Sequence, residues 1–308
     1  MSIAPRLRLG TRASTLARWQ ADWVASQLQR RGIDVEMVLI ATQGDVRSGP
    51  IGAIGSQGVF TKEIQRALLD GRVDLAVHSL KDLPTDTIDG LALAAVPPRE
   101  RVGDALVSNQ VTEFQSLGPG ARVGTGSTRR RAQLLHVRPD LQVLDIRGNV
   151  DTRLHHLDEG RYDAIVLAEA GLTRLGLTHR IAQVLPTAWM LPAIGQGALG
   201  LETRADDQHA RGLVAWLDDA DTHAAVVAER ALLATLRGGC LAPVGAWGRV
   251  VNGALQLDAA VLDPHGVQRI EARVVGALTT AEALGQQAAR QLLDQGAAAL
   301  ISQARISQ

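Results

Sequence analysis

Apolar and polar positions in the first third of the chain switch repeatedly between strand and helix periodicity. Residues 6–10, 33–40 and 73–78 are short runs of apolar and β-branched residues, which predict strands. Between them, apolar residues recur at helical spacing over 14–32 and 61–71, each closed by a glycine. This alternation of strand and helix predicts a largely parallel sheet with helices on its faces.

A second series of strands and helices begins after residues 96–100, where Pro97 and Pro98 indicate a domain boundary. Pro186 and Pro192 mark the end of this series. The predicted elements are strands at 104–108, 122–124, 141–146 and 163–167, and helices after Ser127 and over 150–159.

The last third of the chain has a different pattern. Thr222 is a suitable N-cap for a helix over 223–236. Asn252-Gly253 between two apolar runs is a strong hairpin signal, residues 263–266 indicate a second turn, and a closing helix is expected over 280–295. These signals predict a small α+β domain at the end of the chain.

Residues 44–60 hold five glycines and Pro50, which is too flexible a composition for a regular element. The composition of this segment leaves two interpretations open. The segment is either a mobile loop or lid, or a disordered surface insertion.

Length and composition place the chain among globular proteins. At 308 residues and 46% hydrophobic content it can bury a full core, and two or three domains are expected. No apolar run is long enough for a membrane span, and no signal peptide is recognisable, so we expect a cytoplasmic protein. The formal net charge of zero argues against blanket binding to nucleic acid or to an anionic membrane.

The strongest candidate site lies where the strand 122–124 runs into a glycine-bearing turn and a helix. Ser127 precedes three arginines, among them Arg129 and Arg130, in what should be the first helical turn. Cations are disfavoured at a helix N-terminus unless an anion joins them, so an anion site is predicted. A solvated basic face is the alternative. The turn lacks the glycine patterns of ATP and NAD sites.

Two further strand ends carry arginines. Arg147 and Arg153 follow the strand at 141–146, and Arg12 follows the first strand. Side chains at the carboxyl edges of such sheets reach a crevice, so these strand ends are expected to offer arginines to one cleft. Arginine binds carboxylates bidentately, so the predicted ligand carries several carboxylates.

Asp82 follows Lys81 directly after the strand at 73–78. The acid would stabilise a developing cation or move a proton, and the lysine would bind an anion or tune the acid. A surface ion pair is the alternative.

Cys240 is the only cysteine and lies between two glycines and Pro243, which indicates a loop. A small buried hydrophobe and an accessible thiol are both open interpretations. The cysteine and the scattered histidines show no ligand spacing, so no metal site is expected.

Taken together, motifs along nearly the whole chain closely resemble the porphobilinogen deaminase family. The residues that carry the resemblance are Thr11-Arg12-Ala13-Ser14, Trp19-Gln20, Gly44-Asp45, residues 78–84, Arg129-Arg130, Arg147-Gly148-Asn149-Val150, Thr152-Arg153, Ala170-Gly171-Leu172, Arg174-Leu175-Gly176, residues 191–197 and Gly238-Gly239-Cys240.

The resemblance implies an α/β fold with two lobes like those of periplasmic binding proteins and a small α+β C-terminal domain. The implied domains are residues 1–97 with 198–216, residues 98–197, and residues 217–308, which carry the cofactor cysteine. The active cleft would lie between the two lobes. A monomer is the family's implied state.

The resemblance also implies the activity: four porphobilinogen molecules are polymerised, with loss of ammonia, into hydroxymethylbilane in haem biosynthesis. A dipyrromethane cofactor would be attached to Cys240 by a thioether, and Asp82 would be the catalytic acid. Each pyrrole carries two carboxylates. Residues that match the family's binding positions are, for the cofactor, Lys81, Asp82, Ser127, Arg129 and Arg130, and, for the substrate, Arg12, Ser14, Arg147, Arg153, Arg174 and Gln196.

The chain departs from the family at Ala53 and Gln57, where many relatives have lysines, at Gln43, where some have arginine, and at Arg237, where an acid is common. The first three put a carboxylate-binding role of the glycine-rich segment in doubt.

Two other functions compete with the polymerisation of porphobilinogen. One is a cytosolic two-lobed protein that binds a polycarboxylate. The other is an acyl or amide transferase that uses Cys240, although no histidine is placed to activate the thiol.

Overall fold

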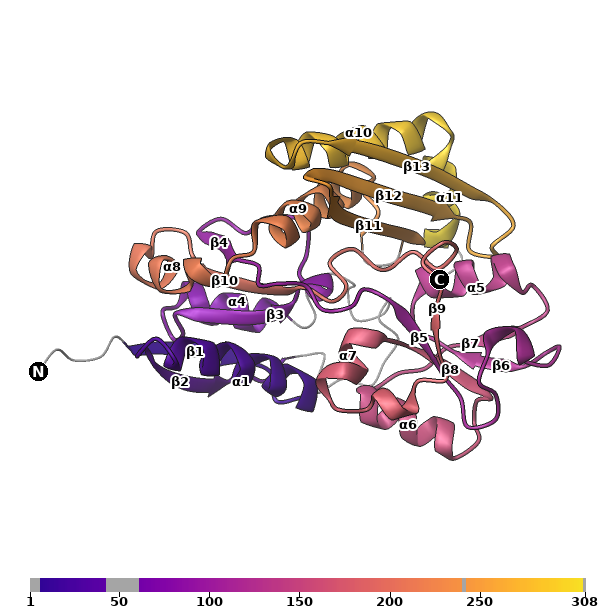
Figure 1. Cartoon of the computed structure of the whole chain (residues 1–308), viewed down its shortest axis with the longest axis horizontal. Helices are drawn as coiled ribbons and strands as arrows, with labels where there is room; N and C mark the ends of the chain where they lie inside the picture. The colour runs from indigo at the N-terminus through magenta and orange to yellow at the C-terminus, as the bar shows by residue number, and fades with distance from the viewer. Residues whose placement is uncertain (1–5, 43–60, 240–241, 307–308) are drawn as a thin grey trace, which may run out of the picture. The chain divides into compact units, whose positions relative to one another are not determined.

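The computed structural model describes residues 6–42, 61–239 and 242–306 (Figure 1). The chain divides into two compact units, residues 1–99 with 198–223 and residues 100–197 with 224–308. We call them unit 1 and unit 2. Three sheets are present in the described part of the chain, one in unit 1 and two in unit 2.

The sheet of unit 1 has the strand order β2-β1-β3-β10-β4. Its first three strands are parallel, as the sequence predicts, but β10 is antiparallel to both β3 and β4. The prediction of a largely parallel sheet is therefore wrong for half of its pairings, because the chain leaves this sheet after β4 and returns with β10. The strands are β1 (Arg6–Thr11), β2 (Asp34–Leu39), β3 (Leu75–Ser79), β4 (Leu91–Ala95) and β10 (Leu199–Arg204).

Helices cover both faces of this sheet. Side chains of consecutive strand residues point to opposite faces, and on β3 Leu75 packs with α1 (Thr15–Gln29) and α8 (Gln208–Val214), whereas Ala76 packs with α4 (Lys62–Leu69). The strands are thus buried on both sides, which explains their nearly continuous apolar sequences.

The larger sheet of unit 2 repeats this arrangement, with the order β7-β6-β8-β5-β9, three parallel strands and then two antiparallel ones. Its strands are β5 (Asp104–Val107), β6 (Arg122–Gly124), β7 (Gln142–Leu144), β8 (Ala164–Ala168) and β9 (Gln183–Leu185), and its helices are α5 (Thr128–Val137), α6 (Val150–Asp158) and α7 (Glu169–Arg174).

The C-terminal part of unit 2 is a three-stranded antiparallel sheet, β11-β12-β13, packed with helices (Figure 1). The predicted hairpin is present, because Val251 and Ala254 pair across the Asn252-Gly253 turn. The elements are α9 (Ala220–Thr235), β11 (Val244–Val251), β12 (Ala254–Leu262), β13 (Arg269–Gly276), α10 (Ala281–Asp294) and α11 (Ala297–Ile306). The short 3-10 turns are η1 (Leu80–Asp82), η2 (Phe114–Ser116), η3 (Thr178–Arg180), η4 (Ala215–Leu217) and η5 (Leu278–Thr280).

Two details of the last third differ from the sequence prediction. Helix α9 begins at Ala220, and the carboxylate of Asp219 accepts a hydrogen bond from Thr222 N at 2.8 Å, so Asp219 caps the helix instead of Thr222. Helix α11 was not predicted. The α/β class with two sheet-and-helix lobes and a small C-terminal sheet domain is confirmed.

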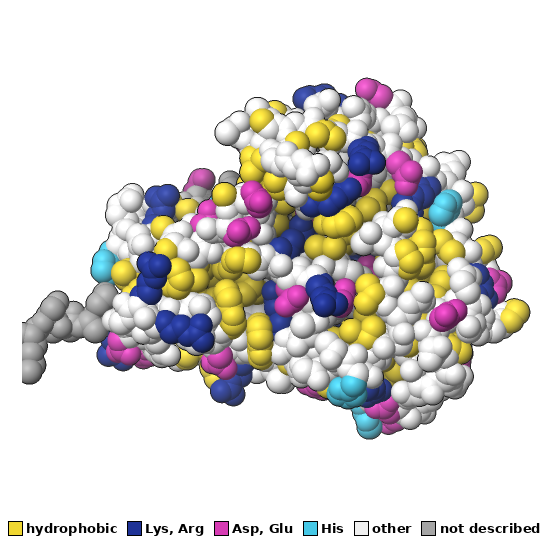
Figure 2. All heavy atoms as spheres, viewed as in Figure 1, with side chains coloured by type: hydrophobic (Ala, Val, Ile, Leu, Met, Phe, Trp, Pro, Cys, Tyr) yellow, Lys and Arg dark blue, Asp and Glu magenta, His cyan; other side chains and the backbone are white. Residues whose placement is uncertain are grey.

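Charges of both signs are mixed on the face of the molecule drawn in Figure 2. Figure 2 shows Lys and Arg side chains interspersed with Asp and Glu side chains, in agreement with the formal net charge of zero. Within the described ranges, no helix has the length and apolarity that crossing a membrane requires.

Candidate active site

Four predicted site residues lie at one edge of the sheet in unit 1. β1 and β3 are parallel neighbours, so their carboxyl ends lie at the same edge. Arg12 and Ser14 follow β1, and Ser14 caps α1 by accepting a backbone N–H at 3.4 Å. Lys81 and Asp82 follow β3 in the turn η1, with Lys81 exposed and Asp82 half-buried.

A buried polar network supports the end of β3. His78 Nε2 lies 3.1 Å from Glu202 Oε2, and Gln65 Nε2 donates to Glu202 Oε1 at 3.0 Å. One residue further along β3, Gln20 Nε2 donates to Ser79 Oγ at 2.8 Å. Because buried polar groups require partners, these contacts fix the orientation of β3 immediately before the turn η1.

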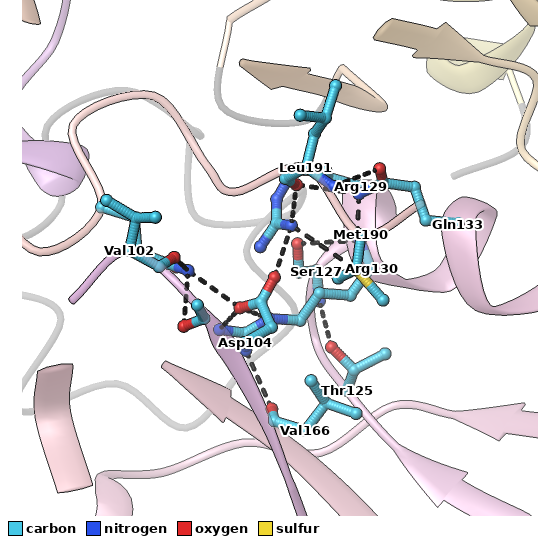
Figure 3. A network of polar contacts seen from close by, with 12 residues as sticks. Val102, Asp104, Thr125, Ser127, Arg129, Arg130, Gln133, Val166, Met190 and Leu191 are labelled. Carbon is cyan, nitrogen blue, oxygen red and sulfur yellow. Dashed lines mark hydrogen bonds and ion pairs between the residues drawn. The ribbon is translucent and has the colours of Figure 1, made fainter. Parts of the chain in front are cut away.

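In unit 2, two buried arginines of α5 share one carboxylate (Figure 3). Arg129 and Arg130 are 4% and 6% exposed, and Asp104 is fully buried at the start of β5. Arg129 Nη1 donates to Asp104 Oδ2 at 2.6 Å, and Arg130 Nε donates to Asp104 Oδ1 at 2.9 Å. Arg130 also donates to Val166 O at 2.9 Å, and Arg129 to Leu191 O at 2.6 Å.

The charges of this cluster are strongly coupled. Burial alone would raise the pKa of Asp104, but the ion pairs with Arg129 and Arg130 outweigh burial and hold that pKa far below its ordinary value of 3.8. Burial in turn lowers the pKa of the Arg130 guanidinium. Counted over the described residues, one carboxylate between two guanidinium groups leaves one net positive charge, which an anionic ligand would neutralise.

The turn at residues 195–197 connects two more predicted residues to this cluster. Gln196 Nε2 donates to Asp104 Oδ1 at 3.0 Å and to Val102 O at 2.8 Å. Arg174, at the end of α7, donates from Nη2 to Gly197 O at 2.7 Å. The structure thus brings Arg129, Arg130 and Gln196 onto one carboxylate and fixes Arg174 to the same turn as Gln196.

The remaining predicted residues have other surroundings. Ser127 caps α5 by accepting from Arg130 N at 3.4 Å. Arg147, in the loop after β7, donates from Nε to Asp145 Oδ2 at 2.9 Å, and Arg153, in α6, donates from Nε to Gly148 O at 2.8 Å. That Arg12 and these arginines share one cleft stays a prediction. Cys240 and the segment 44–60 lie outside the described residues.

Sequence reasoning missed two residues that hold the cluster together. The sequence predicts Asp104 only as the first residue of an apolar strand. The one signal of a further role is that Asp104 is the single acidic residue in this strand. Gln133, fully buried in α5, donates to Leu191 O at 3.0 Å and accepts from Leu191 N at 2.9 Å. Nothing in the sequence distinguishes Gln133 from a solvated glutamine.

The fold and these sites define an α/β protein that carries basic side chains at the carboxyl edges of two similar sheets and a buried arginine pair beside one of them. Two family profiles together match almost the whole sequence. "Porphobilinogen deaminase, dipyromethane cofactor binding domain" matches residues 7–212, and "Porphobilinogen deaminase, C-terminal domain" matches residues 223–294. The chain belongs to the porphobilinogen deaminase family.

Individual relatives agree with this assignment. The chain is 48% identical to a porphobilinogen deaminase of Trichlorobacter lovleyi over 97% of both chains. It is 48% identical to that of Geobacter sulfurreducens, over 94% of this chain and 92% of the relative. The protein of the same name from Desulforudis audaxviator is 49% identical, over 96% and 97%.

Solved structures give a weaker likeness. The methionine-binding protein MetQ matches 69% of this chain and 89% of its own, with 13% identity and a TM-score of 0.46. A periplasmic substrate-binding protein from Coxiella burnetii matches 68% and 91%, with 18% identity and a TM-score of 0.44. At these TM-scores the likeness carries no conclusion about this chain.

Proposed function

We propose that Cys240 carries a dipyrromethane cofactor and that the residues at the two sheet edges bind the cofactor and the substrate. The reaction is that of the family: a transferase joins four porphobilinogen molecules into hydroxymethylbilane and releases ammonia. The single observation that supports our assignment of residues most strongly is the buried pair Arg129 and Arg130, which shares one carboxylate among the residues that the structure describes.

The residues of unit 2 fit such a cofactor. Arg129 Nε is buried and has no hydrogen-bond partner among the described residues, so one guanidinium donor of the pair is left for a ligand. Guanidinium groups are also the donors that match carboxylates best, and each pyrrole ring carries two carboxylates. Arg129, Arg130 and Ser127 would hold the cofactor, and the family resemblance adds Lys81 and Asp82 of unit 1. When bound, the dipyrromethane supplies the free α-carbon to which the first substrate is joined.

The chain's own residues then have separate tasks. Asp82 would stabilise the cationic pyrrole N–H groups and move protons, since an acid at a strand end can approach the reacting atoms. The carboxylates of the incoming substrate would be bound by Arg12, Ser14, Arg147, Arg153, Arg174 and Gln196. We further propose, from the family resemblance, a cytoplasmic monomer.

Intact-protein mass tests this assignment with two matched variants. We expect the wild-type chain to be heavier than its sequence by one dipyrromethane, and Cys240→Ser to have lost this mass. Asp82→Asn, which keeps the shape of the side chain, should retain the mass but lower kcat by about 10²–10⁴, the usual share of a general acid.

An active wild-type chain without added mass would overturn the attachment to Cys240. Near-normal turnover of Asp82→Asn would remove Asp82 from the mechanism. The competing polycarboxylate-binding protein would carry no covalent addition and would form no tetrapyrrole from porphobilinogen.

A further inference from the structure

The turn at residues 195–197 is fixed at its backbone as well as through Gln196. The N–H of Gly195 donates to Glu229 Oε2 at 2.7 Å. At the other end of the turn, the Gly197 carbonyl accepts from Glu100 N at 3.1 Å. Gly197 has a φ of 85°, and a Cβ there would collide with the Glu100 carbonyl, so only glycine suits this position.

Glu229 is an unusual partner for this turn, because it is a carboxylate with 0% of its surface exposed. It lies in α9, and its second oxygen, Oε1, accepts from Gly248 N in β11 at 2.8 Å. A Cβ at Gly248 would lie 2.7 Å from the carbonyl of Ala225, so the absence of a side chain allows β11 to approach α9 this closely. Glu229 therefore joins α9, β11 and the turn.

The two contacts require a carboxylate. Glu229 offers one acceptor oxygen to each of two backbone donors, and hydrogen bonds to an ionised acceptor are the stronger kind. A glutamine of the same shape has one acceptor oxygen and an NH₂ group, so it would direct a donor at one of the two N–H groups. Burying a charge is costly unless it is well bonded, and these two backbone contacts are bonds of that kind.

We propose that Glu229 is a positioning residue for the substrate-binding turn. By holding Gly195, it sets the position of the Gln196 amide and of the Gly197 carbonyl to which Arg174 is bonded. Glu229 itself does not touch the substrate. This inference rests on the proposed function, which assigns Gln196 and Arg174 to the carboxylates of porphobilinogen.

The test compares steady-state kinetics and glycine amide spectra of the cofactor-bearing enzyme. In wild type labelled with ¹⁵N-glycine, the amide protons of Gly195 and Gly248 should resonate downfield and exchange slowly. In Glu229→Gln at least one of them should move upfield, and KM for porphobilinogen should rise about tenfold, the effect of one charge-assisted hydrogen bond. The kcat should fall less, because Asp82 is untouched.

Leu232→Ala is the matched control. Leu232 is fully buried one turn along the same helix, in the core of the C-terminal sheet, so its truncation destabilises the same region without touching the turn. We expect its KM and its Gly195 resonance to stay at wild-type values. Glu229→Asp, which keeps the charge on a shorter side chain, should give an intermediate KM.

Two results would overturn the inference. One is a KM for Glu229→Gln that is no higher than that of Leu232→Ala. The other, which needs no variant, is a wild-type Gly195 amide that exchanges as fast as a solvated one. If Gln196→Ala and Arg174→Lys themselves leave KM unchanged, the assignment of the turn to substrate fails first; if they raise KM and Glu229→Gln does not, only the role of Glu229 fails.

Discussion

Asp104 is the residue that makes a buried arginine pair possible. Two guanidinium groups on consecutive residues repel each other, and burial costs each of them its hydration. Asp104 faces both, and Gln196 donates to the same carboxylate. The cluster therefore has a defined geometry before any ligand binds, which lowers the cost of ordering the side chains on binding.

We predict that Asp104→Asn destabilises the protein by about 3–5 kcal/mol at pH 7, because it leaves two buried cations without their partner. The difference in the free energy of unfolding between wild type and Asp104→Asn should decrease as the pH is lowered. Since folding lowers the pKa of Asp104, its contribution is fully present above the ordinary value of 3.8 and is lost as the pH falls toward the lower folded pKa. Urea unfolding of both proteins between pH 7 and pH 3 measures this.

A stability difference between the two proteins that is already absent at pH 5 would contradict this role of Asp104.

The sequence could indicate the arginines, because cations at a helix N-terminus need an anion, but it could not indicate their partner. Asp104 lies 25 residues before Arg129, and only the pairing of β5 with β8 brings it under α5.

At the scale of elements, the C-terminal domain depends on close contact between α9 and α10. A Cβ added at Gly285 of α10 would collide with the backbone carbonyl of Ala228 in α9 and would lie 2.9 Å from the Cβ of Ala231. Backbone atoms cannot move aside as a flexible side chain can, so the two helices would have to separate.

Gly285→Ala should therefore lower the free energy of unfolding by about 1–3 kcal/mol, the usual cost of overpacking. Gly212→Ala is its matched control, because Gly212 also lies in a helix but an added Cβ meets no atom within 4 Å. There the same substitution should stabilise by about 0.5–1 kcal/mol through helix propensity. Equal effects at the two positions, measured by urea unfolding, would contradict the packing argument.

Most elements could be predicted from the sequence because their signals are local. The spacing of apolar residues indicates α1, and Asn252-Gly253 marks the turn between β11 and β12. The antiparallel position of β10 could not be predicted in this way, because its pairing with β3 joins residues at least 120 positions apart. The cap of α9 was missed because Asp219 and Thr222 are both good capping residues.

At the scale of the whole molecule, family membership and local structure support different statements. The match over residues 7–212 and 223–294 establishes the reaction, whereas the described contacts show a buried arginine pair and the residues that hold it in place. A net charge of zero with a locally buried arginine pair fits a small polycarboxylate better than a large polyanion. The resemblance predicts the activity, whereas the contacts of Asp104 and Glu229 can be seen only in the fold.

We expect the tetrapyrrole to grow while it is covalently bound to this chain. The most direct test is the intact mass of the enzyme mixed with limiting porphobilinogen and quenched at short times. We predict a series of species, each heavier than the last by one porphobilinogen less one ammonia, that ends at four additions and returns to the starting mass as product is released. A chain whose mass stays constant while hydroxymethylbilane accumulates would show that the tetrapyrrole does not grow on the protein.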